Sequence, residues 1–317
     1  MDHFKPIVGE SPALQSLLRS AKIAAATDVT VLLKGETGTG KEVLANAIQR
    51  SSHRADKPFI TLNCAALPET LIESELFGHR KGSFTGAASN TEGLFRAAHG
   101  GTLFLDEINS LSVSIQAKLL RFIESGECLA VGDTEPYIVD VRIIAATNSD
   151  LSQDIAKGTF RRDLYYRLNV VPLDIPPLSE RLGDLDLLIN HFMKVFEREL
   201  NVLAPQFSKN TFKVLKGHDW PGNIRELKNL CERLSILLPG KIIEPENLPF
   251  EMNARKPKLQ PTVVLTASGL QLDDLEASLI QQALDMTRGN RSKSARLLGL
   301  TRDTLRYRME KHGFLES

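Results

Sequence analysis

A glycine-rich turn between an apolar run and a helical segment constrains this chain of 317 residues more than any other feature. Residues 29–33 form a mostly apolar run typical of a buried strand, and apolar residues within 43–48 recur at helical spacing. The turn between them consists of Gly35, Glu36, Thr37, Gly38, Thr39, Gly40, Lys41 and Glu42. Its glycines let backbone N–H groups converge on a phosphate chain, and its lysine adds a charge between the β and γ phosphates. The pattern predicts a nucleoside triphosphate site, a P-loop, between a strand and a helix.

Two carboxylates are predicted to complete this site. Glu42 stands where most P-loops have a Ser or Thr whose hydroxyl binds magnesium, so the metal must be held mainly from elsewhere. Residues 100–105 read as a strand that ends in Asp106 and Glu107, and open α/β sheets bind their ligands at the carboxyl ends of strands. Asp106 can bind Mg²⁺ or its water, while Glu107 can polarise a water for attack on the γ phosphorus.

Strands and helices alternate through the first half of the chain, which predicts an α/β fold with a parallel sheet. Further strands are expected at residues 59–63 and 141–146, and helices near 7–26, 69–77 and 113–125. Ser11 is expected to cap the first helix, with Pro12 in its first turn. The second of these strands ends in Thr147 and Asn148; the Asn148 amide could bond a γ phosphate or the attacking water, and an ordinary loop cap is equally compatible.

The segment 160–168 concentrates three arginines, Arg161, Arg162 and Arg167. Arginine can neutralise the charge that develops on a transferring phosphoryl group, although a solvated basic helix face would have the same composition. After Pro172, Pro176 and Pro177 the pattern predicts helices only, as far as residue 238. We interpret this part as a small helical lid that follows the sheet.

Residues 78–87 form a polar segment with an unexpected tip, in which Phe84 and Thr85 lie between Gly82 and Gly86. No helical or alternating period would bury these two residues. The segment could be an exposed functional loop or an ordinary surface hairpin whose Phe84 folds back on the core.

The 39 basic and 39 acidic residues cancel, so a nucleic-acid partner would need a local basic patch. Residues 288–312 provide one, because eight Lys or Arg stand there against Asp303 and Glu310. Helices expected at 272–286, 291–298 and 301–312, with a glycine turn between the last two, predict a helix-turn-helix; a basic oligomerisation module is the alternative. The candidate DNA contacts are Arg291, Lys293, Thr301, Arg302, Thr304, Arg306 and Arg308.

These patterns predict four parts: an ATPase α/β subdomain at 1–171, a lid at 172–250, a linker at 251–271 and a helix-turn-helix domain at 272–317. The three cysteines, far apart and odd in number, fit neither a disulfide framework nor a metal site. No apolar run approaches the length of a membrane span, and the N-terminus lacks an apolar signal region. We therefore expect a soluble, untargeted protein of the reducing cytoplasm.

The combination resembles the sigma-54-dependent transcriptional activators, which are bacterial enhancer-binding proteins of the AAA+ ATPase superfamily. The P-loop of that family usually carries the glutamate found here at position 42. The strongest marker is the run Gly82, Ser83, Phe84, Thr85, Gly86 and Ala87, which matches the family's Gly-Ala-Phe-Thr-Gly-Ala loop except at Ser83. The resemblance implies that Phe84 and Thr85 grip sigma-54.

The resemblance also implies roles for matching residues, with ATP and Mg²⁺ as cofactors. Asn63 would hold Glu107 and relay the nucleotide state, Asn148 would be the first sensor, and Arg225 in the run 222–227 would be the second sensor on the lid. Arg161 and Arg167 match arginine fingers that act on the ATP of a neighbouring subunit, and Arg162 occupies a variable position of that pattern. Ile7 and Val8 are expected at the nucleotide.

A finger that acts on a neighbour implies a homo-oligomer, in this family usually a hexameric ring. The C-terminal segment is similar to the Fis-type helix-turn-helix, which implies dimers through that domain and double-stranded enhancer DNA as a partner, beside the sigma-54 RNA polymerase holoenzyme. We expect ATP binding to raise the Phe84 loop onto sigma-54 and hydrolysis to withdraw it.

Two other functions remain compatible with the residues. The first is a DNA-binding regulator whose ATPase is only structural, although such relatives lack the Phe-Thr loop. The second is an AAA+ DNA motor, whose ATPase DNA of any sequence would stimulate. Met1 lies almost at the start of the ATPase module, so we expect either control by a separate partner or a fragment of a longer chain.

Overall fold

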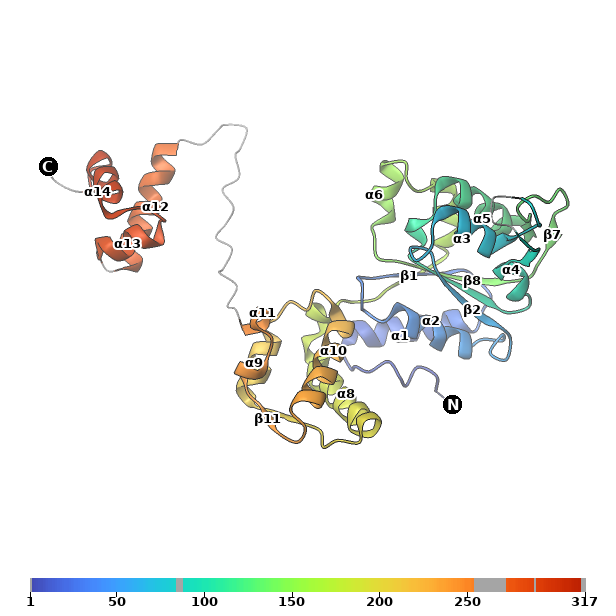
Figure 1. The fold of residues 1–317 in the computed structure, drawn as a ribbon, viewed down its shortest axis with the longest axis horizontal. Coiled ribbons are helices and arrows are strands. Elements are labelled where there is room, and N and C mark those ends of the chain that lie inside the picture. The colour runs from blue at the N-terminus through green and yellow to red at the C-terminus, as the bar shows by residue number, and fades with distance from the viewer. Residues whose placement is uncertain (1, 84–87, 254–271, 288, 315–317) are drawn as a thin grey trace. The chain divides into compact units, whose positions relative to one another are not determined.

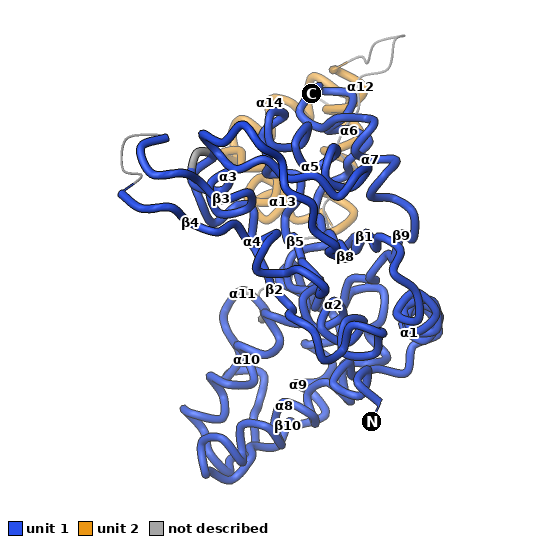
Figure 2. The backbone as a smooth tube through the Cα atoms, turned by 90° about the vertical axis from the view of Figure 1, so that its right-hand side faces the viewer, with its two compact units in different colours: residues 1–254 blue, residues 255–317 orange. Residues whose placement is uncertain are grey.

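The computed structural model describes residues 2–83, 88–253, 272–287 and 289–314. Two compact units result, Met1–Ala254 and Arg255–Ser317, and Figure 2 colours them separately. Each unit is described by itself. In the described residues, none of the helices combines the length and the apolar character that crossing a membrane requires.

A five-stranded parallel sheet forms the centre of the first unit, which confirms the predicted fold class. Its order is β2 (Phe59–Asn63), β5 (Thr102–Asp106), β8 (Arg142–Thr147), β1 (Val31–Lys34) and β9 (Val171–Asp174). Because the strands are parallel, their carboxyl ends meet at one edge of the sheet. The register sets Asn63 opposite Asp106 and Lys34 opposite Thr147, so the predicted functional residues share that edge.

Helices cover both faces of this sheet, as Figure 1 shows. One face packs against α1 (Pro12–Ala25) and α2 (Lys41–Arg50). The other packs against α3 (Glu69–Phe77), α4 (Leu94–Ala97), η1 (Ile108–Ser110), α5 (Val113–Ser125), α6 (Leu151–Ala156) and α7 (Arg162–Leu168). Strand residues alternate between the two cores: Leu103 and Leu105 belong to the second, whereas Phe104 between them belongs to the first. Burial on both faces explains the continuous apolar runs in the sequence.

The predicted cap of the first helix is wrong. Ser11 precedes α1, but its side chain makes no capping hydrogen bond. Instead the N–H groups of Glu10 and Ser11 donate to Asp184 Oδ1 at 2.7 and 2.9 Å. This contact joins residues far apart in the chain, which a local capping pattern does not reveal.

Two short antiparallel hairpins adjoin the second face. One pairs β3 (Gly78–His79) with β4 (Thr91–Glu92), and the other pairs β6 (Glu127–Cys128) with β7 (Tyr137–Ile138). A bridge from His79 to Val131 joins the two hairpins.

The lid follows β9 and completes the first unit. It consists of η2 (Leu178–Asp184), α8 (Leu185–Leu200), β10 (Gln206–Phe207), α9 (Lys209–Lys216), α10 (Asn223–Leu237), β11 (Ile242–Ile243), η3 (Pro245–Asn247) and α11 (Phe250–Asn253). Its own core contains Leu188, Leu227 and the fully buried Trp220. The prediction of helices only is wrong here, because β10 and β11 form a two-stranded sheet. Two residues per strand are too few to leave a period in the sequence.

The second unit contains α12 (Leu272–Met286), α13 (Arg291–Leu297) and α14 (Arg302–Lys311) around a small core of Ile280, Ala295, Leu305 and Met309. The side chains of Asn290 and Thr301 cap α13 and α14. Gly299, with φ of 67°, makes the tight turn between those two helices, as the sequence predicts.

Candidate functional site

The P-loop connects β1 to α2 and holds the Lys41 side chain inward. Lys41 is 8% exposed, and its Nζ donates to the carbonyl oxygens of Gly35 and Glu36 at 2.8 and 3.0 Å. Burial lowers the pKa of Lys41, while the nearby carboxylates of Asp106 and Glu107 oppose that shift. An ammonium group carries three donors, so one remains for a phosphate oxygen.

The two carboxylates follow β5, beside the P-loop. Asp106 Oδ1 accepts a hydrogen bond from the Glu107 N–H at 3.0 Å. Glu107 has φ of 54°, a left-handed conformation that is uncommon for residues other than glycine and that recurs at functional sites. Asp106 and Glu107 line the same cavity as Lys41.

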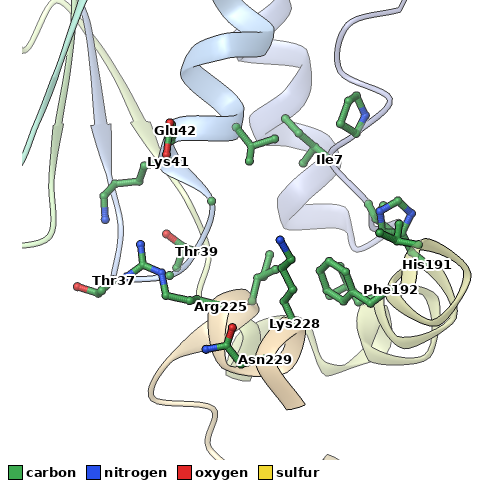
Figure 3. Close-up of a pocket in the computed structure, with 18 of the residues that line it drawn as sticks. Ile7, Thr37, Thr39, Lys41, Glu42, His191, Phe192, Arg225, Lys228 and Asn229 are labelled. Atoms are coloured by element: carbon green, nitrogen blue, oxygen red, sulfur yellow. The ribbon is translucent and has the colours of Figure 1, made fainter. Parts of the chain in front are cut away.

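This cavity has a volume of about 560 Å³ and lies between the P-loop, the N-terminal segment and the lid. Figure 3 shows Lys41 and Thr37 on one side, Ile7 on another, and side chains of α8 and α10 closing the space. The sequence-predicted residues that line it are Ile7, Val8, Thr37, Gly38, Thr39, Gly40, Lys41, Glu42, Asp106, Glu107 and Arg225. The size and the mixture of apolar and charged walls suit a nucleotide.

The lid contributes residues that sequence reasoning missed. They are Leu188, His191, Phe192, Val195, Ile224, Lys228 and Asn229. Ile224 belongs to the run 222–227 that carries Arg225, but the others read as ordinary positions of amphipathic helices. Only tertiary packing turns those helix faces towards the P-loop.

The two predicted asparagines lie at the carboxyl ends of β2 and β8, the strands on either side of β5. Asn148 Nδ2 donates to Thr37 Oγ1 at 3.2 Å, which joins the end of β8 to the P-loop. Asn63 lies opposite Asp106, and its Oδ1 accepts from the Ala65 N–H at 2.8 Å. Its predicted hold on Glu107 stays a prediction.

Of the predicted arginine fingers, Arg161 is the N-cap residue of α7 and Arg167 lies within that helix. Arg161 Nε and Nη2 donate to Asp163 at 3.0 and 2.7 Å, and Arg167 pairs with Glu124 at 3.2 Å. Both side chains are partly exposed. Neither contributes to the wall around Lys41.

The predicted sigma-54 loop belongs to the segment between β3 and β4. Gly82 has φ of 82°, and Ser83 donates its N–H to the Arg80 carbonyl at 3.2 Å. Arg80 pairs with Asp133 of the neighbouring hairpin at 2.7 Å. Phe84, Thr85, Gly86 and Ala87 lie outside the described residues.

Comparison with known proteins decides the family. The family model described as the sigma-54 interaction domain matches residues 7–174. The chain belongs to the sigma-54-dependent activators. The AAA+ ATPase lid domain and the bacterial regulatory protein Fis family match residues 179–265 and 271–312 of this activator.

Individual relatives agree with this membership. The transcriptional regulatory protein ZraR of Salmonella typhimurium is 46% identical over 299 residues, which cover 94% of this chain and 67% of that protein. The DNA-binding transcriptional regulator NtrC of Rhizobium meliloti is 43% identical over 338 residues, covering 97% of this chain and 70% of that protein. The solved structure of NtrX from Brucella abortus in complex with ATP is similar with a TM-score of 0.72 and 33% identity, covering 96% of this chain and 69% of that chain.

The activator's helix-turn-helix unit carries the candidate DNA contacts. Arg291, Lys293, Thr301, Arg302 and Arg306 are exposed, Thr304 and Arg308 only partly. Thr301 also caps α14 by accepting from the Thr304 N–H at 3.2 Å. Arg308 pairs with Glu276 of α12, and the hydrogen bond from His312, followed by Arg308, lowers the pKa of Glu276. Arg308 thus has an intramolecular partner that the sequence did not reveal.

Proposed function

We propose that this protein is an ATP-hydrolysing transcriptional activator that binds enhancer DNA and remodels the closed complex of sigma-54 RNA polymerase. One observation carries the proposal: Lys41, Asp106 and Glu107 line one cavity in a chain of the sigma-54 activator family. Such an arrangement can bind a triphosphate and direct a water at its γ phosphorus.

Within the cavity each group has a separate task. The Lys41 ammonium and the P-loop N–H groups hold the β and γ phosphates. The Glu107 carboxylate orients and polarises the attacking water. Asn148, directly after β8 and bonded to Thr37 of the P-loop, would approach the phosphates from the sheet. Arg225 of α10, which lines the cavity, would approach them from the lid and add positive charge where negative charge develops.

Mg²⁺ fits the donor set at the carboxyl end of β5. Asp106 supplies a carboxylate oxygen, the hard ligand that Mg²⁺ prefers, while Glu42 cannot supply the usual hydroxyl. When bound, Mg²⁺ neutralises charge on the phosphate oxygens. Asp106 is therefore the proposed metal ligand.

The connection from the cavity to the loop follows the chain. Asn63 ends β2 beside Asp106, and α3 leads from there to the β3–β4 hairpin that carries Gly82 to Ala87. We infer that Asn63 senses the state of Glu107 and that this path moves Phe84 and Thr85 onto sigma-54. The Arg80–Asp133 pair supports the loop at its base.

Assembly and DNA binding complete the proposal. Arg161 and Arg167 would reach the nucleotide of the neighbouring subunit in a ring, a hexamer by family resemblance. This agrees with the observation that neither of them lines the cavity of its own chain. The C-terminal units would pair as dimers. The α14 helix would enter the major groove with Arg302 and Arg306, while Arg291 and Lys293 contact phosphates.

Replacing Thr85 by Ala tests the division of labour. ATP turnover should stay within about twofold of the parent, because Thr85 belongs to the segment between β3 and β4 and neither strand lines the nucleotide cavity. Open-complex formation on a sigma-54 promoter should be lost. Thr61→Ala, the same change at an exposed position of β2, is the matched control for both assays.

Two outcomes would overturn the proposal. Equal loss of turnover and promoter opening in Thr85→Ala would show that ATP hydrolysis and action on sigma-54 are not divided between the nucleotide cavity and the loop. If the parent protein, loaded with a transition-state mimic of ATP, does not bind sigma-54, then sigma-54 is excluded as its partner. ATPase stimulation by DNA of any sequence would instead indicate a DNA motor.

A further inference from the structure

The tip of the P-loop, residues 36–38, is hydrogen-bonded on two sides. Towards the sheet, Thr37 Oγ1 accepts from Asn148. Towards the lid, Asn223 Nδ2 donates to Glu36 Oε2 at 2.9 Å and to the Thr37 carbonyl at 3.2 Å. The Gly38 carbonyl accepts from the Arg225 N–H at 3.2 Å. The start of α10 is therefore attached directly to the loop that surrounds the phosphates.

Asn223 is unusual in itself. It is the first residue of α10, is fully buried, and has φ of 52°, a left-handed conformation that costs a non-glycine residue energy. Its Oδ1 accepts from the Leu178 N–H at 2.8 Å, at the start of η2 where the chain passes from the sheet to the lid. One side chain thus joins the P-loop, the hinge and α10.

Glu36 has a matching peculiarity. It belongs to the P-loop, yet it does not line the cavity, and its Oε2 is bonded to the lid. Arg225, two residues after Asn223, does line the cavity. Any shift of the first turn of α10 relative to the P-loop would move the Arg225 guanidinium relative to the phosphates.

We propose that Asn223 is a positioning residue: with Glu36 as its partner, it fixes the start of α10 on the P-loop and so sets where Arg225 meets the nucleotide. This proposal rests on ATP binding in the cavity, as argued under the proposed function, and needs neither sigma-54 nor DNA. The role of Glu36 in this proposal is therefore to hold the first turn of α10 and not to contact the nucleotide.

The Asn223→Asp variant tests the contact. The new carboxylate can still accept from the Leu178 N–H, but it sets oxygen against the Glu36 carboxylate and the Thr37 carbonyl. Two lost hydrogen bonds and a like-charge contact should weaken binding of a fluorescent ATP analogue about tenfold or more. Asn210→Asp, the same change at an exposed position of α9, is the control and should bind like the parent.

Two double variants distinguish positioning from simple structural damage. In an Arg225→Ala background, Asn223→Asp should weaken binding by no more than about twofold, because its effect passes through Arg225. In a Glu36→Gln background the loss should shrink to about threefold or less, because the glutamine amide can donate to the new carboxylate. Circular dichroism checks that each variant folds.

Equal losses with and without Arg225 would overturn the proposal, as would no rescue by Glu36→Gln. If Asn223→Asp does not fold, Glu36→Ala provides the test, since that side chain is exposed. Its loss of affinity should then disappear when Arg225 is also replaced, and persistence of the loss would count against the proposal. None of these outcomes depends on promoter opening, so the sigma-54 function is tested separately.

Discussion

Adding one methyl group at Gly38 should uncouple the lid from the P-loop. Gly38 has φ of 81°, and a Cβ built there would lie 2.3 Å from the Gly222 carbonyl oxygen and 3.1 Å from Arg225 Cβ. A backbone oxygen cannot turn aside as a flexible side chain can. In Gly38→Ala the segment around Gly222 must therefore retreat from the P-loop.

The magnitude follows from two contributions. An alanine in the left-handed region costs about 1–2 kcal/mol. Retreat of the lid also breaks the bonds from Arg225 N to Gly38 O and from Asn223 Nδ2 to Thr37 O, each worth about 1 kcal/mol net. Loss of the docked lid alone, about 2 kcal/mol, corresponds to about a 30-fold loss of ATP affinity.

Gly158→Ala separates the two contributions. Gly158 has φ of 75°, but a Cβ there would meet nothing within 4 Å. In this control the free energy of unfolding, measured by thermal denaturation, should fall by about 1 kcal/mol or slightly more, while the ATP affinity should stay unchanged. Titration of both variants with a fluorescent ATP analogue measures the difference. Parental affinity in Gly38→Ala, or an equal loss in Gly158→Ala, would refute the reasoning.

Two further predictions concern other parts of the first unit. Lys41→Ala should not bind nucleotide, and Arg161→Ala should not hydrolyse it. An equimolar mixture of the two variants should regain part of the ATPase activity, because some subunit interfaces then join an intact cavity to an intact finger. A mixture as inactive as its components would exclude Arg161 as a finger in trans. Burial raises the pKa of the Cys64 and Cys128 thiols to about 12. In the folded protein at pH 8 neither thiol should therefore react with a thiol reagent until denaturant is added. A colorimetric thiol assay with and without denaturant checks this.

The sequence predicted the local features of the site well. The P-loop lies between a strand and a helix because glycine spacing and apolar periodicity are properties of neighbouring residues. Asp106 joins Lys41 in one cavity because the carboxyl ends of parallel strands meet at one edge of the sheet. These predictions required only that the strands form one parallel sheet. They did not require knowledge of any side-chain contact.

Features that depend on packing were not predictable. Asn223 and Glu36 are 187 positions apart, and no pattern in either neighbourhood names the other. His191 and Phe192 border the cavity only because α8 packs beside α10 in the lid core. The same holds for Asp184, whose carboxylate accepts a hydrogen bond from the backbone N–H of Ser11, where the sequence predicted a local helix cap. Sequence periodicity identifies the buried face of a helix but not the element that it meets.

The carboxylates beside the α7 arginines have a consequence for enzyme behaviour on dilution. Arg161 forms an ion pair with Asp163 in the first turn of α7, and Arg167 forms one with Glu124. In the proposed ring these two arginines would face the phosphates bound to a neighbouring subunit, so assembly would have to replace the intramolecular ion pairs by contacts to those phosphates. Turnover per chain should consequently fall steeply as subunits separate, and idle single subunits would waste little ATP.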